Sequence, residues 1–343
     1  MTLHSRLVFT ACLLLASSPL PVLPFQGLTS DSPVSIEPRK RPEPHLGITP
    51  DMPAAALPPA NLRADVSMVL VPAHVTNGLG APVGDLAKEN FKIFEDGVEQ
   101  PITYFAWEDA PVSVGFLIDS SGSMRNKMHQ SAEAASALLK TANTEDEFFV
   151  VEFNEKAKLL LPFTSNSEQV HQTVSHVRPI GRTSLLDAVH LALTQMKKAR
   201  NPRKAIVIVS DGGDNRSRYT FSEVKNQMIE SEVQVYTMGI FDPEERRKRT
   251  PEEEYGPQLL GDLAQESGGK HYNVDDLDDL PATAERIGQE LRSQYILGYS
   301  PGNVERDGKY HRIKVMLSGS KARNLDVRYR RGYNAPGYNA PGR

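Results

Sequence analysis

The stretch Val112–Met124, which reads VSVGFLIDSSGSM, decides the fold that we expect for this chain. A short, mostly apolar run ends abruptly in a loop of Asp, Ser and Gly. The stretch at 205–213, AIVIVSDGG, repeats this design further along the chain. Short apolar runs without alternation are typical of strands that are buried on both faces of a parallel sheet.

Helical periodicity separates these strands. Apolar residues recur every three or four positions in several segments, of which the clearest are Leu185, Val189, Ala192 and Met196, and Leu280, Ala284, Ile287 and Leu291. Such spacing predicts helices that bury one face. Strands that alternate with helices predict an α/β fold over residues 110–293, with a doubly wound, mostly parallel sheet flanked by helices.

Two shorter segments, 61–108 and 294–333, alternate apolar and polar residues as half-buried strands do. Each has too few strands to enclose a core alone. We therefore expect them to form one small β-sandwich, with the α/β domain inserted between its N-terminal and C-terminal strands. In that sandwich the C-terminal strands should cover Ile102 and Tyr104.

The two ends of the chain carry segments without a core pattern. Residues 1–25 show the polar start and apolar run of a signal peptide, which predicts export to the periplasm, the cell surface or the medium. An uncleaved anchor is the alternative. Residues 26–60 are predicted to be a Pro-rich linker, and residues 334–343, within a tandem YNAPG repeat, a low-complexity tail.

Composition excludes several classes of function. The 343 residues include 39 Lys and Arg against 43 Asp and Glu, a net charge of −4, which argues against a nucleic-acid partner. Cys12 is the one cysteine, so intramolecular disulfides and paired-cysteine zinc sites are excluded. We expect no transmembrane span beyond the signal segment. The sequence does not indicate an oligomeric state.

A candidate metal site lies in three loops. Each loop falls where a strand ends or a helix begins, and such loops gather at the carboxyl edge of a doubly wound sheet. The candidate ligands are Asp119, Ser121, Ser123, Thr183 and Asp211. Hydroxyl and carboxylate oxygens suit a divalent cation such as Mg²⁺, with Mn²⁺ or Ca²⁺ as alternatives. With only two acidic ligands the cation stays electropositive and can attract a further carboxylate.

These motifs resemble the von Willebrand factor type A domain and its metal-ion-dependent adhesion site. The whole chain is similar to a bacterial exported group with this Rossmann-like domain, in which an EDG strand pair, here Glu95–Gly97, precedes it and a YxLGYxP segment, here Tyr295–Pro301, follows. The resemblance implies that the three hydroxyls bind the cation, that the two aspartates act largely through water or hydrogen bonds, and that a protein partner supplies an Asp or Glu.

We therefore expect an exported, metal-dependent binding or adhesion protein rather than an enzyme. Two alternatives remain open, namely a metal-free structural scaffold of the cell envelope and a metal-dependent hydrolase that uses Ser121 or Ser123. No His or Lys base lies in the three loops, which argues against the hydrolase. Residues 241–257 combine many charges with three prolines and are expected to form a solvated loop, with a partner-binding or proteolysis-sensitive insertion as the alternative.

Overall fold

The computed structural model describes residues 68–241, 251–301 and 308–335. The predicted signal peptide and Pro-rich linker lie outside the described residues. All described residues belong to one unit, Arg63–Arg343, so the contacts within it can be discussed together. Within the described ranges no helix is long and apolar enough to cross a membrane.

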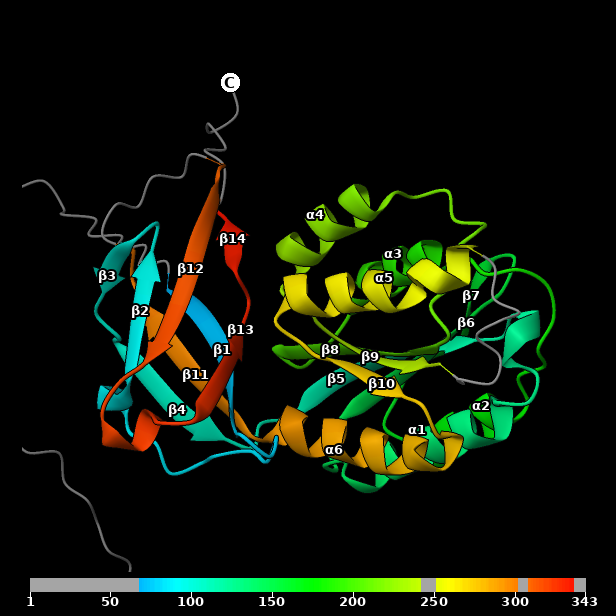
Figure 1. The fold of residues 1–343 in the computed structure, drawn as a ribbon, viewed down its shortest axis with the longest axis horizontal. Coiled ribbons are helices and arrows are strands. Elements are labelled where there is room, and N and C mark those ends of the chain that lie inside the picture. The colour runs from blue at the N-terminus through cyan, green and yellow to red at the C-terminus, as the bar shows by residue number, and fades with distance from the viewer. Residues whose placement is uncertain (1–67, 242–250, 302–307, 336–343) are drawn as a thin grey trace, which may run out of the picture. The chain divides into compact units, whose positions relative to one another are not determined.

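A six-stranded sheet in the order β10-β9-β8-β5-β6-β7 forms the α/β part (Figure 1). Its neighbouring strands are parallel except for β6 and β7, which are antiparallel. All eight residues of β5 are buried, as its apolar sequence predicts. The strands are β5 Val112–Asp119, β6 Glu147–Phe153, β7 Ala157–Thr164, β8 Arg203–Ser210, β9 Gln234–Ile240 and β10 His271–Val274.

Helices cover both faces of this sheet, with α1, α2 and α6 below it and α3, α4 and α5 above it in Figure 1. Alternate residues of β5 divide between two cores: Phe116 packs with the first group of helices and Leu117 with the second. The doubly wound α/β prediction is therefore confirmed. The helices are α1 Met128–Lys140, α2 Ser167–Ser175, α3 Leu185–Met196, α4 Phe221–Ser231, α5 Pro251–Ser267 and α6 Leu280–Arg292.

The predicted β-sandwich forms the second part of the fold and combines strands from both ends of the chain. One sheet has the order β13-β1-β11-β4, in which N-terminal and C-terminal strands alternate. The other has the order β14-β12-β2-β3, in which C-terminal β12 pairs with N-terminal β2. Val71, Ile93, Tyr295 and Ile313 fill the core between the sheets. The strands are β1 Val69–Asn77, β2 Phe91–Glu95, β3 Val98–Gln100, β4 Tyr104–Glu108, β11 Gln294–Tyr299, β12 Tyr310–Leu317, β13 Leu325–Tyr329 and β14 Gly332–Asn334.

The structure corrects the expectation for Tyr104. Ile102 is buried as expected, but Tyr104 is 40% exposed on the outer face of its sheet. Phe105 points inward instead, where its ring lies 5.8 Å from that of Tyr295. Side chains alternate between the two faces of a strand. Because the strand is interrupted between Ile102 and β4, Phe105 rather than Tyr104 faces the core.

Two segments without a core pattern contain ordered structure. The expected solvated loop at 241–257 overlaps α5, which begins at Pro251 and continues through Pro257. Pro251 is tolerated as the first residue of the helix because the N–H it lacks has no helical partner there, whereas Pro257 lies inside the helix. At the C-terminus, the first copy of the YNAPG repeat begins in β14, where the Tyr333 hydroxyl donates to Glu95 at 2.6 Å. Its tyrosine therefore belongs to the sandwich.

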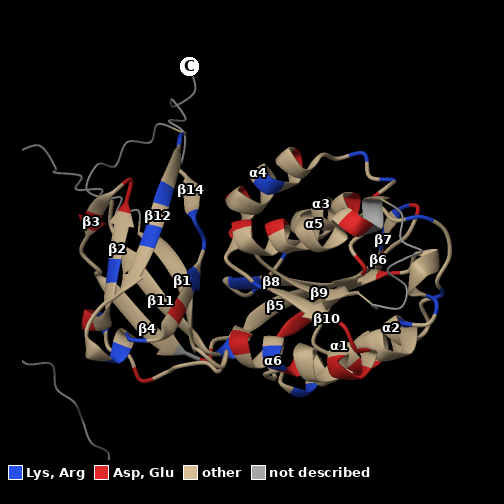
Figure 2. Cartoon of the chain, viewed as in Figure 1, with Lys and Arg blue, Asp and Glu red and all other residues tan. Residues whose placement is uncertain are grey.

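Polar side chains join the sandwich to the α/β part. Arg328 of β13 pairs with Glu290 of α6, which also accepts a hydrogen bond from the Tyr272 hydroxyl. His74 of β1 lies 2.9 Å from the Tyr236 hydroxyl. Burial lowers the pKa of His74 to about 4, and the positive charge of Arg328 adds to this shift. Elsewhere, Figure 2 shows acidic and basic residues interspersed along α1 and α6.

Candidate metal centre

The first loop begins at Asp119, the last residue of β5, whose side chain is fully buried. Its Oδ1 accepts a hydrogen bond from the backbone N–H of Ser121 at 2.8 Å, and its Oδ2 accepts one from Ser210 Oγ at 2.5 Å. A short 3-10 turn, Gly122–Met124, follows. The hydroxyl oxygens of Ser121 and Ser123 lie 3.0 Å apart. Carboxylate and hydroxyl oxygens thus gather at the carboxyl end of a buried strand.

Backbone hydrogen bonds hold the second loop against the first. Ile180 N donates to Ser120 O at 2.7 Å, and Gly122 N donates to Gly181 O at 3.0 Å. Gly181 has a φ of +83°, and a Cβ at this position would lie 2.8 Å from Glu155 Cγ. A side chain would therefore be strained there, and glycine allows the loop to approach.

The third loop, which follows β8, is tied to the second. Thr183 N donates to Asn215 Oδ1 at 3.1 Å, while Asn215 N donates back to Thr183 O at 3.1 Å. Thr183 is only 4% exposed, and Asp211, which directly follows β8, is only 6% exposed. Three loops far apart in the sequence therefore meet at one edge of the sheet.

The charges in this site are poorly compensated. Burial raises the pKa of Asp119 to about 7, and the negative charge of Asp211 adds to this shift. Asp211 Oδ1 is buried and has no hydrogen-bond partner among the residues that the structure describes, and Oδ2 lies 3.5 Å from Lys127 Nζ. Both side chains of this ion pair are less than 10% exposed. Buried carboxylates with an unsatisfied oxygen are costly unless a cation compensates them.

Helix α5 lies against the third loop. Gly212 has a φ of +84°, and a Cβ there would lie 2.6 Å from the Cα of Gly256 in α5. The two backbones are therefore in direct contact. Because the sequence predicted a solvated loop at this position, the contact between α5 and the site was not foreseen.

The structure thus brings the loops of all five predicted ligands together. Their oxygen chemistry fits a divalent cation, and the unpaired Asp211 Oδ1 is the observation that favours one. Within the part of the chain that the structure describes, no cluster of three or more His, Cys, Asp and Glu side chains could hold a metal. A cation would therefore depend on the hydroxyls of Ser121, Ser123 and Thr183. The role of these residues as ligands stays a prediction.

Sequence reasoning missed two residues that shape this site. Lys127 lies just before α1 and pairs with Asp211, which is 84 residues further along the chain. No local pattern in the sequence indicates this ion pair. Asn215 could only be placed beside the site. Its position in the SDGGDN stretch signalled proximity, but its paired hydrogen bonds to Thr183 depend on how the loops meet.

Comparison with known families identifies this architecture. Residues 114–213 match the family model of the von Willebrand factor type A domain. Residues 114–213 therefore match a von Willebrand factor type A domain, and the predicted resemblance to this domain is confirmed over these residues.

Curated relatives match parts of the chain. Inter-alpha-trypsin inhibitor heavy chain H2 of Mesocricetus auratus is 28% identical over 158 residues, which is 40% of this chain and 17% of that protein. An uncharacterised protein of Borreliella burgdorferi is 23% identical over 188 residues, covering 49% of this chain and 55% of the relative. The chain thus spans less than a fifth of the heavy chain that it matches.

Solved structures with a similar fold are remote in sequence. A von Willebrand factor type A protein from Catenulispora acidiphila has a TM-score of 0.47 and 13% identity, covering 71% of this chain and 75% of that one. BatB from Bacteroides thetaiotaomicron has a TM-score of 0.43 and 19% identity, covering 53% and 100%. Proximal thread matrix protein 1 of the mussel byssus, solved with zinc in its MIDAS motif, has a TM-score of 0.46 and 15% identity, covering 58% and 50%.

Proposed function

We propose that this chain is an exported binding protein that recognises a protein partner through a divalent cation. The ion would be held by Asp119, Ser121, Ser123, Thr183 and Asp211, and a partner's Asp or Glu would complete its coordination. One observation carries the proposal: two buried carboxylates share the site, and Asp211 Oδ1 has no hydrogen-bond partner. A divalent cation supplies the charge and the contact that this oxygen lacks.

The donor set favours binding of an acidic partner. Three of the five ligands are neutral hydroxyls, so the two aspartates would leave a dication electrophilic. An incoming carboxylate is a hard oxygen ligand of the kind that Mg²⁺ prefers. The ion would then join the two proteins directly, and its removal by a chelator should abolish the complex.

We propose no catalytic role for this site. Lys127 is the one base candidate that the structure adds, but its ammonium faces the Asp211 carboxylate at 3.5 Å. An ammonium paired in this way is charged and cannot accept the proton of a serine hydroxyl. A hydrolase that uses Ser121 or Ser123 is thus the weaker alternative, and turnover abolished by Asp119→Ala would favour it.

Calorimetric titration of the chain with Mg²⁺, Mn²⁺, Ca²⁺ and Zn²⁺ tests the metal site. We expect saturable binding of at least one ion, and loss of that binding in Asp119→Ala and Thr183→Ala. Thr173→Ala on α2 is the matched control, because its hydroxyl only bonds within the helix. The metal site is disproved if wild type binds none of these ions up to millimolar concentration, or if both site variants bind as well as wild type.

Capture from envelope extract tests the partner and its carboxylate. The metal-loaded chain should retain a protein that a chelator releases, and Asp→Asn or Glu→Gln substitution in that partner should abolish the contact. Retention that is unchanged by chelator would leave the structural scaffold as the better function. N-terminal sequencing of the mature protein from cell fractions tests export.

A further inference from the structure

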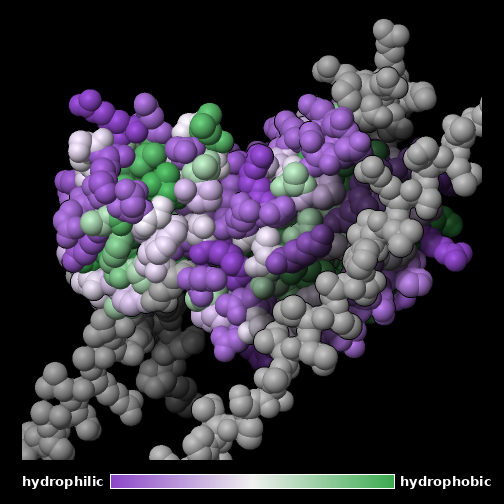
Figure 3. Space-filling model, turned by 90° about the horizontal axis from the view of Figure 1, so that it is seen from below, coloured by the Kyte–Doolittle hydropathy of each residue, from purple (hydrophilic) through white to green (hydrophobic). Residues whose placement is uncertain are grey.

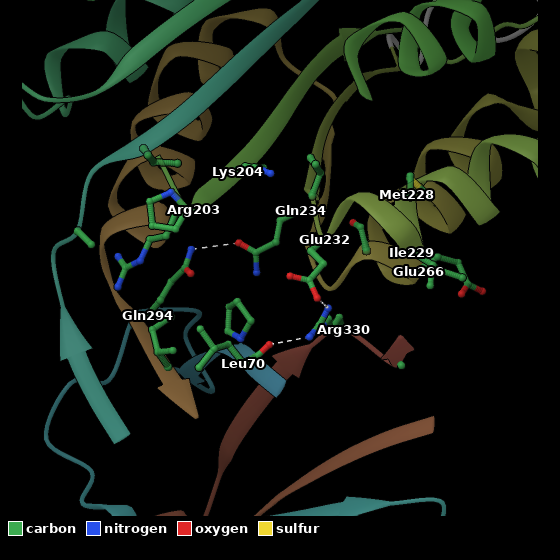
Figure 4. A pocket seen from close by; sticks show the side chains of 18 of the residues that line it. Leu70, Arg203, Lys204, Met228, Ile229, Glu232, Gln234, Glu266, Gln294 and Arg330 are labelled. Atoms are coloured by element: carbon green, nitrogen blue, oxygen red, sulfur yellow. Dashed lines mark hydrogen bonds and ion pairs between the residues drawn. The ribbon is translucent and has the colours of Figure 1, made fainter. Parts of the chain in front are cut away.

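A cavity of about 400 Å³ lies between the β-sandwich and the α/β part (Figure 4). Leu70 of β1 and Ile296 of β11 line it from the sandwich, while Lys204 of β8 and Ile229 of α4 line it from the α/β part. The lining residues of β8 and β9 lie at the amino ends of these strands. The cavity is therefore at the opposite edge of the sheet from the candidate metal centre.

Apolar side chains form the rim of this cavity on the sandwich. Met68, Leu70 and Tyr104 are 44%, 43% and 40% exposed, and all three line the cavity. They converge over Gly298, where a Cβ would lie 2.8 Å from Tyr104 Cβ, 2.9 Å from Met68 Sδ and 3.1 Å from Leu70 Cδ2. Figure 3 shows apolar residues gathered on the part of the surface that the sandwich forms. A contiguous exposed apolar patch marks a binding surface more often than scattered apolar residues do.

The charged residues of the lining leave an excess of positive charge. Glu232 pairs with Arg330, and Glu266 pairs with Lys225 at 2.9 Å. Lys204 therefore adds a cationic group that these two lining carboxylates do not match. In Figure 4 the side chains of Lys204, Gln234 and Glu232 surround the same space as Leu70 and Arg330.

We propose that this cavity binds an amphipathic organic anion, a medium-chain carboxylate. The apolar chain would lie on the patch of Met68, Leu70 and Tyr104, and the carboxylate would face Lys204. Binding pockets of this size are mostly apolar, with a few polar groups that fix the orientation of the ligand, and they occur often between domains. The charge complementarity at Lys204 selects an anion over a cation or a neutral alcohol.

Calorimetric titration of the full chain with decanoate tests this proposal. We expect saturable binding, no saturable binding of decyltrimethylammonium under the same conditions, and no change when a chelator is added. The last result separates this cavity from the metal centre, so that either proposal can fail alone. No saturable decanoate binding, or equal binding of the cationic analogue, overturns the proposal.

Two variants locate the bound molecule. Lys204→Met should weaken decanoate binding about threefold or more, as expected for loss of one partly exposed charge, whereas Lys158→Met on β7 should not.

Ile229→Trp should block the cavity, and Leu79→Trp, at a position that is 94% exposed, is its control. Both cavity variants should keep the wild-type melting temperature within a few degrees. If decanoate binding is unchanged in both cavity variants, the anion binds elsewhere and the proposed site is disproved.

Discussion

Lys127 already supplies a positive charge where we propose that a divalent cation binds. Its ammonium lies 3.5 Å from Asp211 Oδ2, and both side chains are buried. A cation at Asp211 must therefore compete with this internal ion pair. Lys127 would lower the affinity for metal while stabilising the metal-free protein.

Replacing this residue should separate the two effects. Lys127→Met is expected to raise the affinity for the divalent ion about threefold to tenfold, because no ammonium then competes for the carboxylate. Without metal the same variant should be about 3 kcal/mol less stable, since a buried charge loses its partner. Calorimetry and chemical denaturation measure the two quantities. Lys140→Met at the exposed end of α1 is the control, and equal metal affinity in wild type and Lys127→Met would contradict this competition.

At the scale of single elements, helix α5 offers a matched pair of glycines. A Cβ at Gly256 would lie 2.6 Å from the backbone oxygen of Asp211, whereas a Cβ at Gly261 would meet nothing within 4 Å. Gly261→Ala should therefore stabilise the chain by about 0.5–1 kcal/mol, because alanine is the better helix former. Gly256→Ala should lose stability and metal affinity together, as α5 and the site loop are forced apart. Thermal melts and metal titration decide this, and a Gly256→Ala variant with wild-type metal affinity would show that α5 does not shape the site.

Elements with a strong local pattern were predictable from the sequence. The buried strands at 112–118 and 205–209 and the periodic helices follow from apolar spacing alone, and their order determined which loops would meet. The prediction that Tyr104 is covered was wrong, because the strand is interrupted between Ile102 and Tyr104 and the alternation of apolar and polar residues does not reveal this. Only the first part of α5, residues 251–257, was predicted as a loop, because its charges and prolines argued against packing. The contacts of Lys127 and Asn215 come from tertiary structure, and no local pattern encodes them.

For the whole molecule, His74 makes stability depend on pH. It is buried between the sandwich and the α/β part, where Arg328, Glu290 and Arg203 are the charged groups that act on it. The folded state lowers the pKa of His74 from 6.5 to about 4, so between these values the unfolded chain binds a proton that the folded chain does not. Above pH 6.5, His74 does not lower the free energy of unfolding. Its protonation in the unfolded chain lowers that free energy by about 3 kcal/mol as the pH drops to 4.

Denaturation curves between pH 7 and pH 4 check this dependence. His74→Gln should have a shallower loss of stability than wild type over that interval, while His171→Gln, at a partly exposed position of α2, should follow the wild-type curve. Parallel curves for wild type and His74→Gln would show that another group causes the loss.

Truncation tests how far the sandwich depends on both chain ends. A chain that ends at Arg292 lacks β11 to β14, and with them half of each sheet. Val71, Ile93 and Ile102 would then be exposed to solvent. We expect strong binding of a hydrophobic dye and aggregation. A chain that ends at Ala335 keeps every described strand and should behave as wild type, and a soluble, dye-free chain ending at Arg292 would contradict the shared core.

The register between β4 and β11 has one more consequence. Glu108, where the chain leaves the sandwich, is paired with Gln294, where it returns. Neighbouring residues of antiparallel strands are about 5 Å apart, which a tight two-residue turn can bridge. The sandwich could therefore be closed into a hairpin without the α/β insert, and any other domain whose ends lie this close could be grafted in its place. The inserted domain is in this sense exchangeable, while the sandwich around it stays the same.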